Sequence, residues 1–149
     1  MKALVVYEST WGNTEKIAQA IAAGLAGGTR ALPLKTASAE ELDRIDLLVI
    51  GSPVNNGRPS PSMQTYLKSV KPETAAKLKV AAFDTRLRSR FATMLGNAAS
   101  RMTAQFEELG SNVIAAPEGF NVKGQKGPLA DGEIDRATRW GKDLARLRT

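Results

Sequence analysis

The sequence predicts a doubly wound α/β fold, a three-layer sandwich with a five-stranded parallel sheet of order 2-1-3-4-5. Short continuous apolar runs, typical of strands buried on both faces, alternate with segments of helical apolar periodicity. The first apolar run leads directly into a glycine- and hydroxyl-rich turn that opens a helix. With 149 residues there is room for one core, so residues 1–149 are expected to form a single domain.

The first part of the chain contains two strand and helix units. An apolar run at residues 2–7 predicts the first strand, and an amphipathic helix is predicted over about 14–25. Its apolar face carries Ile17, Ile21 and Leu25. A weaker run at 29–34 predicts the second strand, followed by a short helix beginning at Ser38, which has capping-box spacing to Glu41.

The middle of the chain contains two further strands. The third is predicted at 46–50, and its loop at 51–61 precedes an amphipathic helix. The apolar face of that helix carries Met63, Tyr66, Leu67 and Val70. The fourth strand is predicted at 80–83 and its loop at 84–91. Since carboxyl ends of parallel strands share one edge, the loops after strands one, three and four should converge there.

The last part of the chain begins with a helix predicted over about 92–109 and a fifth strand at 113–116. A long connection over 117–132 follows, and Asp131 is the expected N-cap of the final helix, with Glu133 in its first turn. The apolar stripe of that helix carries Ile134, Ala137, Trp140, Leu144 and Leu147. This stripe places Trp140 in the core rather than at a ligand.

The turn after the first strand has the composition of a phosphate site. Unpaired N–H groups and the positive end of the dipole favour a phosphate at a helix N-terminus. Polar side chains are offered by Ser9, Thr10, Asn13 and Thr14. Gly12 permits a positive φ or close backbone approach. The spacing matches neither a Walker loop nor a dinucleotide fingerprint. The alternative is an ordinary polar turn in which Asn13 or Thr14 caps the helix.

Composition excludes several function classes. The chain has no cysteine and no histidine, which argues against disulfides, thiolate metal sites and most hydrolytic or zinc chemistry. Redox chemistry would therefore need a borrowed cofactor, and no catalytic or metal-binding side chain is predicted. No apolar run reaches the length of a signal-peptide core or the ~20 residues of a spanning helix, so a cytoplasmic protein without membrane insertion is expected.

The run S-T-W-G-N-T resembles the phosphate loop of the flavodoxin family, which holds FMN by hydroxyls and amides without a cationic side chain. By this resemblance the 5′-phosphate of FMN would be bound by Ser9, Thr10, Trp11, Gly12, Asn13 and Thr14. The run G-S-P-V-N-N-G, followed by Ser60, Met63 and Leu67, resembles flavodoxin-like quinone reductases of the tryptophan-repressor-binding type. This second resemblance implies that the flavin ring is faced by Ser52, Pro53, Val54, Asn55, Asn56 and Gly57.

Two further features follow from the resemblance. The pyrimidine edge of the flavin would be met after strand four by Asp84, Thr85 and Arg86. In flavodoxins a glycine peptide of the second loop can turn its carbonyl toward the reduced ring, and Asn56-Gly57 tolerates the positive φ that this needs. The alternative is that Asn-Gly is simply a favoured turn dipeptide. The second and third loops offer no stacking aromatic, unlike many flavodoxins.

The charge balance differs from typically acidic flavodoxins, because 21 Lys+Arg outnumber 15 Asp+Glu. The loops expected around the ring contain Arg58, Arg86, Arg88 and Arg90. Redox partner proteins with acidic surfaces, or an anionic substrate, would suit them, and the alternative is a solvated surface. Nucleic acid is not expected, because these loops lack interleaved aromatics. The protein is expected to be a monomer or weak dimer.

The function that these observations favour is an FMN-binding electron carrier of the flavodoxin type. One alternative is an FMN-dependent NAD(P)H:quinone-type oxidoreductase, which would need an open flavin face and room for nicotinamide. Another is a flavin-free binding module, which the missing aromatics allow. Response-regulator receivers share the topology, but they need an aspartate where Ser52 stands and a lysine where Pro117 follows the fifth strand.

Overall fold

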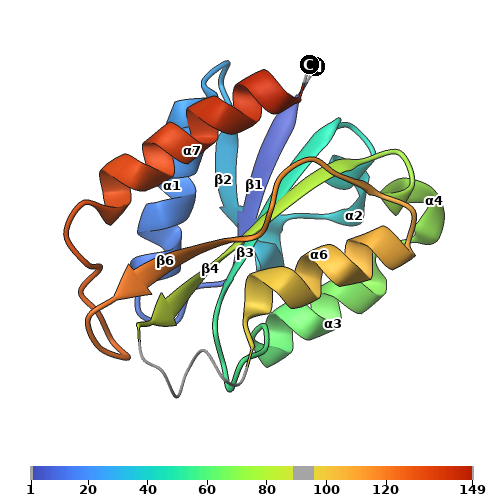
Figure 1. The fold of residues 1–149 in the computed structure, drawn as a ribbon. Coiled ribbons are helices and arrows are strands. Elements are labelled where there is room, and N and C mark those ends of the chain that lie inside the picture. The colour runs from blue at the N-terminus through green and yellow to red at the C-terminus, as the bar shows by residue number, and fades with distance from the viewer. Residues whose placement is uncertain (1, 89–95, 149) are drawn as a thin grey trace.

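A computed structural model describes residues 2–88 and 96–148, and its centre is a parallel β-sheet (Figure 1). The strands of these residues are β1 (Ala3–Tyr7), β2 (Arg30–Pro33), β3 (Leu47–Pro53), β4 (Lys79–Leu87), β5 (Asn112–Val113) and β6 (Glu118–Val122). Their order is β2-β1-β3-β4-β5, with β6 also paired to β4. The predicted fold class and strand order are therefore confirmed.

Helices cover both faces of the sheet. They are α1 (Asn13–Leu25), α2 (Ala39–Leu42), α3 (Pro61–Ser69), α4 (Pro72–Ala75), α6 (Ala98–Glu108) and α7 (Glu133–Leu147), with a 3-10 turn η1 (Leu34–Thr36). In Figure 1, α1 and α7 lie together on one face, and α3 and α6 lie on the other. In the described part of the chain, no helix combines the length and apolar character needed to cross a bilayer.

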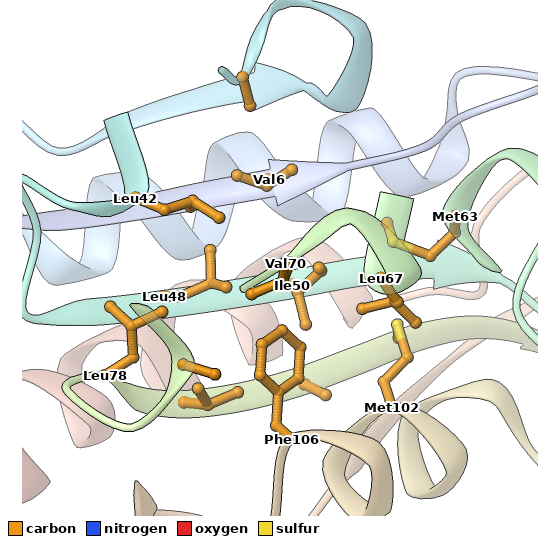
Figure 2. Close-up of a cluster of buried hydrophobic side chains, with 14 of the residues drawn as sticks. Val6, Leu42, Leu48, Ile50, Met63, Leu67, Val70, Leu78, Met102 and Phe106 are labelled. Atoms are coloured by element: carbon orange, nitrogen blue, oxygen red, sulfur yellow. The ribbon is translucent and has the colours of Figure 1, made fainter. Parts of the chain in front are cut away.

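Alternating side chains of the strands build one core on each face of the sheet. On the α3 and α6 face, Leu48 and Ile50 of β3 pack with Met102 and Phe106 of α6 (Figure 2). On the other face, β1 and β3 pack against α1 and α7. Trp140 of α7 joins this second core and makes edge contacts with the rings of Phe83 and Phe120, as its place on the apolar stripe predicted.

Strands three and four are longer than predicted. β3 runs on through residues 51–53 and β4 through residues 84–87, which had been expected in loops. The ladder continues because Ser52 pairs with Asp84 and Pro53 with Thr85. Both strands thus continue beyond the apolar runs that predicted them, through segments that include the polar residues Ser52, Asp84 and Thr85.

The fifth strand is the element that the sequence predicted least well. The expected run at 113–116 forms only the two-residue β5, beside Lys79 and Val80 of β4. The chain then leaves the sheet and returns as β6, which pairs with residues 83–87 of β4 inside what was expected to be a connection. Since β6 extends the same edge, β4 has a neighbour along most of its length.

The helix boundaries also differ from two predictions. Residues 92–95 of the helix predicted over 92–109 lie outside the described residues, and α6 begins at Ala98 with Asn97 as its N-cap. The N-cap of α7 is Gly132, with φ 81°, and not Asp131. Asp131 is largely exposed and pairs with Lys123 instead.

Glu133 in the first turn of α7 ties the helix to β6. Its carboxylate accepts hydrogen bonds from the Asn121 amide at 2.7 Å and from Arg136. The Arg136 hydrogen bond is the main cause that lowers the pKa of Glu133 from its ordinary value of 4.5, and burial opposes it. Because the pKa of Glu133 is lower in the folded state than in the unfolded state, its interactions stabilise the fold at a pH above 4.5. This contribution is lost as the pH falls through the pKa of Glu133 in the folded protein.

Glu133→Gln is expected to lower the free energy of unfolding at neutral pH by about 1 kcal/mol. Urea midpoints measured between about pH 7 and pH 3 should show this difference shrinking with acid, because wild-type Glu133 then becomes neutral as well. Asp143→Asn, an exposed change on the same helix, is the control. If the difference in urea midpoint between wild type and Glu133→Gln stays constant with pH, Glu133 does not have this role.

Helices α1 and α7 cross through two glycines. A Cβ on Gly141 would lie 2.3 Å from the Ile21 carbonyl oxygen, and one on Gly24 would lie 2.1 Å from the Thr138 carbonyl oxygen. These atoms belong to the backbone and cannot move away as a flexible side chain could. The crossing therefore depends on the absence of both side chains.

Gly141→Ala is expected to destabilise the protein by about 2 kcal/mol despite the higher helix propensity of alanine, because the helices must separate. Chemical denaturation measures the loss. Lys142→Ala, at the exposed neighbouring position, should leave the midpoint nearly unchanged. A Gly141→Ala variant as stable as wild type would show that the helices can move apart without cost.

Candidate functional site

A cavity of about 460 Å³ lies at the carboxyl end of the sheet, where ligands bind in open α/β folds. Its walls come from the loops after β1, β3 and β6, the end of β4 and the residues before α6. The lining residues are Thr10, Trp11, Asn13, Thr14, Pro53, Val54, Asn55, Asn56, Gly57, Thr85, Arg86, Leu87, Gly96, Asn97, Val122 and Gln125. The volume falls in the usual range of small-molecule and cofactor pockets.

Most of the predicted site residues line this cavity, so the expected convergence of three loops is observed. Four predicted residues do not line it: Ser9, Gly12, Ser52 and Asp84. Each of these four residues lies next to lining residues. Their residue types suggest contact with a ligand, and in the structure their polar atoms contact neighbouring protein groups.

The turn after β1 presents free backbone donors. Gly12, with φ 92°, is the N-cap of α1, so the alternative in which Asn13 or Thr14 caps the helix is wrong. The Ser9 hydroxyl accepts hydrogen bonds from the amides of Gly12, at 3.0 Å, and Glu15, at 3.3 Å. Within the described residues, the amides of Asn13 and Thr14 have no acceptor. An anion at this helix N-terminus would meet both.

A buried hydrogen bond fixes this turn against the sheet. The hydroxyls of Thr14 and Thr85 lie 2.8 Å apart, and both residues line the cavity. The bond joins the first turn of α1 to the end of β4. It thereby ties the two predicted site segments to each other.

The loop after β3 forms a two-residue hairpin turn. Asn55 and Arg58 exchange two backbone hydrogen bonds, and the central residues Asn56 and Gly57 have φ of 52° and 77°, as in a type I′ turn. Asn-Gly as a favoured turn dipeptide is therefore confirmed. The Gly57 carbonyl accepts a hydrogen bond at 2.9 Å from the Nε of Arg101 on α6, which fixes its direction.

Ser52 supports this loop from the interior. It is fully buried, and its hydroxyl accepts a hydrogen bond from the Ser60 amide while donating one to the Pro53 carbonyl, both at 2.9 Å. Ser60 is in turn the N-cap of α3. The serine therefore connects the end of β3 to the start of α3.

Asp84 and Arg86 form an ion pair at the end of β4. The Asp84 carboxylate is fully buried and accepts Arg86 Nε at 2.6 Å, Arg86 Nη2 at 2.9 Å and the Ala99 amide of α6 at 2.9 Å. Burial raises the pKa of Asp84, and Arg86 and the α6 amides oppose that shift. The Arg86 side chain is 24% exposed and reaches the cavity wall, with its charge compensated by Asp84.

One wall of the cavity was missed by sequence reasoning. Val122 ends β6, and Gln125 belongs to the loop after it. This loop closes through hydrogen bonds from the Lys123 amide to the Pro128 carbonyl and from the Gly127 amide to the Gly124 carbonyl. Two glycines in a segment without apolar periodicity suggested only a connection. The pairing of β6 with β4 is a long-range feature that brings this loop to the cavity.

The charged rim is less uniform than predicted. Arg58 and Arg88 are exposed beside the cavity walls, while Arg86 is paired with Asp84. Arg90 and Phe91 of the loop predicted at 84–91 lie outside the described residues. Two apolar side chains at the mouth are also exposed, Trp11 by 52% and Leu87 by 41%.

The sequence of residues 4–115 matches the family model described as a flavodoxin domain. This chain belongs to the flavodoxin domain family. No curated protein is similar enough in sequence to count as a match. The family resemblance inferred from the two loop motifs is thus confirmed, and the match ends before the loop that follows β6.

Solved structures of low sequence identity share the fold of this flavodoxin domain. A flavodoxin from the domain Archaea is 23% identical over 99% of both chains, with a TM-score of 0.83. A WrbA-like flavodoxin from Agrobacterium tumefaciens is 20% identical over 99% of this chain and 96% of its own, with a TM-score of 0.76. The flavodiiron protein from Giardia intestinalis is 19% identical, with a TM-score of 0.75, and this chain covers 36% of its length.

Proposed function

We propose that this flavodoxin domain binds FMN in the cavity and carries electrons between redox partner proteins. The observation that carries the proposal is the pair of free amides on Asn13 and Thr14, at the Gly12-capped start of α1 and beside a cavity of cofactor size. Family membership supports flavin-based electron transfer, and the phosphate-type donors favour FMN over a flavin without phosphate.

The residues of the cavity divide into two groups by chemistry. The phosphate would be held by the hydroxyls of Thr10 and Thr14, the Asn13 side chain and the backbone amides of the turn. The ring would lie against the loop after β3 and the end of β4, where Thr85 and Arg86 face the cavity. Bound FMN would supply the electron chemistry that a chain without cysteine or histidine lacks.

The cavity mouth suits a redox partner with an acidic surface. Exposed Trp11 and Leu87 supply apolar contact area, and exposed Arg58 and Arg88 supply positive charge next to it. Such a patch would steer an acidic protein toward the ring and would do so more weakly at high salt. The carrier function needs no side chain for proton or group transfer.

The test is to purify the full chain, record its visible spectrum and titrate it with FMN. A flavin absorption band, or saturable quenching of FMN fluorescence, is the expected result, together with reversible reduction and reoxidation. Steady oxidation of NAD(P)H with a quinone would instead support the reductase alternative. A colourless protein that leaves FMN fluorescence unchanged would overturn the proposal and favour the flavin-free module.

A further inference from the structure

The loop after β6 brings a cationic side chain to the turn that follows β1. The Nζ atom of Lys126 lies 4.8 Å from the centre of the Trp11 ring, a cation–π distance. Trp11 lies between Thr10 and Gly12, in the turn that presents the free amides. The contact joins residues 115 positions apart in the chain (126 minus 11), so local sequence gives no sign of it.

Backbone constraints hold this loop close to the turn. Gly127 has φ 101°, which L side chains rarely adopt, and a Cβ there would lie 2.7 Å from Asn13 Oδ1, so this turn favours glycine. The backbone hydrogen bonds at each end of the loop, described above, limit its other conformations. Gln125, the neighbour of Lys126, lines the same cavity as Asn13.

The charges around the turn explain why a cation there would matter. Glu15, in the first turn of α1, opposes an anion at the helix N-terminus. Among the described residues, no carboxylate forms an ion pair with Lys126, whereas Lys123 in the same loop pairs with Asp131 at 3.4 Å. Lys126 is therefore the uncompensated cation of this loop.

We infer that Lys126 is a phosphate-recognition residue of the cavity, which adds a positive charge to a turn that otherwise offers only hydroxyls and amides. This inference rests on the proposed function. The Trp11 ring, in the turn that would meet the phosphate, holds the ammonium group beside that turn, from where it would attract the phosphate of FMN and offset Glu15. Lys126 would act on the phosphate and not on the flavin ring. Its charge should therefore strengthen binding of FMN and leave binding of riboflavin, which lacks the phosphate, unchanged.

The experiment compares dissociation constants of FMN and riboflavin, by fluorescence quenching, for the wild type and three variants of the full chain. Lys126→Gln should raise the Kd of FMN about fivefold at low salt and leave that of riboflavin unchanged. The FMN difference should shrink as salt is added. Lys126→Arg should restore wild-type affinity, and Lys123→Gln, the matched control in the same loop, should leave both constants unchanged.

Two results would overturn the inference alone: an unchanged FMN constant in Lys126→Gln, or an equal loss for FMN and riboflavin. The second result would mean that Lys126 acts by ordering Trp11 and not through the phosphate. A wild-type protein that binds neither flavin would overturn the proposed function and this inference together.

Discussion

Replacing Asp84 with alanine is expected to lower the free energy of unfolding by about 3 kcal/mol, the largest effect that we expect of one substitution. The change leaves the Arg86 guanidinium without its counter-charge and removes the acceptor of the Ala99 amide. The estimate lies at the low end for buried pairs because Arg86 is 24% exposed and partly screened by water. Urea denaturation at neutral pH measures the loss.

Two variants make this prediction specific. Asp84→Asn also removes the counter-charge of Arg86, but it keeps the shape of the side chain and an acceptor oxygen for the Ala99 amide, so it should cost less than Asp84→Ala. Asp131→Ala removes an exposed ion pair with Lys123 and should cause no measurable change. If Asp84→Ala and Asp131→Ala unfold at the same urea concentration as wild type, the buried pair does not stabilise the fold.

Replacing Ser9 with alanine is expected to weaken FMN binding by about 30-fold, which corresponds to about 2 kcal/mol. The Ser9 hydroxyl accepts hydrogen bonds from two amides of the turn, and without it the turn loses the geometry that directs the amides of Asn13 and Thr14 toward one point. Riboflavin affinity should change little, because this turn meets only the phosphate. Fluorescence titrations with both flavins measure the difference.

The control for Ser9 is Ser38→Ala. Ser38 makes the same type of contact, accepting a hydrogen bond from the Glu41 amide at the start of α2, away from the cavity. It should leave FMN affinity unchanged. Tighter FMN binding by Ser9→Ala would contradict the supporting role and would mean that the serine hydroxyl competes with the phosphate for the same amides.

Local sequence patterns were sufficient to predict most of the helices and strands of the fold. The strands before the cavity were predicted from apolar runs, and the phosphate-type turn from one glycine and its polar neighbours, because these features depend on contacts near in sequence. Strand ends were less predictable: residues 84–86 are polar or charged, yet pairing with β3 and β6 keeps them in β4. The buried position of Asp84 depends on Arg86 and on α6, and residue type alone suggested a ligand contact.

The lining of the cavity was predicted where it follows loop motifs and missed where it depends on distant pairing. Most of the lining residues after β1 and β3 belong to contiguous motifs, which is why the sequence pointed to them. Gln125 and Lys126 belong to no motif. Gln125 lines the cavity and Lys126 contacts Trp11 only because β6 pairs beside β4. The supporting role of Ser9 also requires coordinates, since a hydroxyl that binds its own turn and one that binds a ligand look alike in sequence.

The meeting of the Lys126 loop with the turn at Trp11 has a consequence for cooperativity. The turn at Trp11 and the loop of Gln125 and Lys126 lie side by side at the cavity. A ligand in the cavity would contact both segments and would therefore favour the state in which both are in place. Ligand occupancy would then add to global stability by mass action. Local fraying of either terminal segment would be suppressed along with complete unfolding.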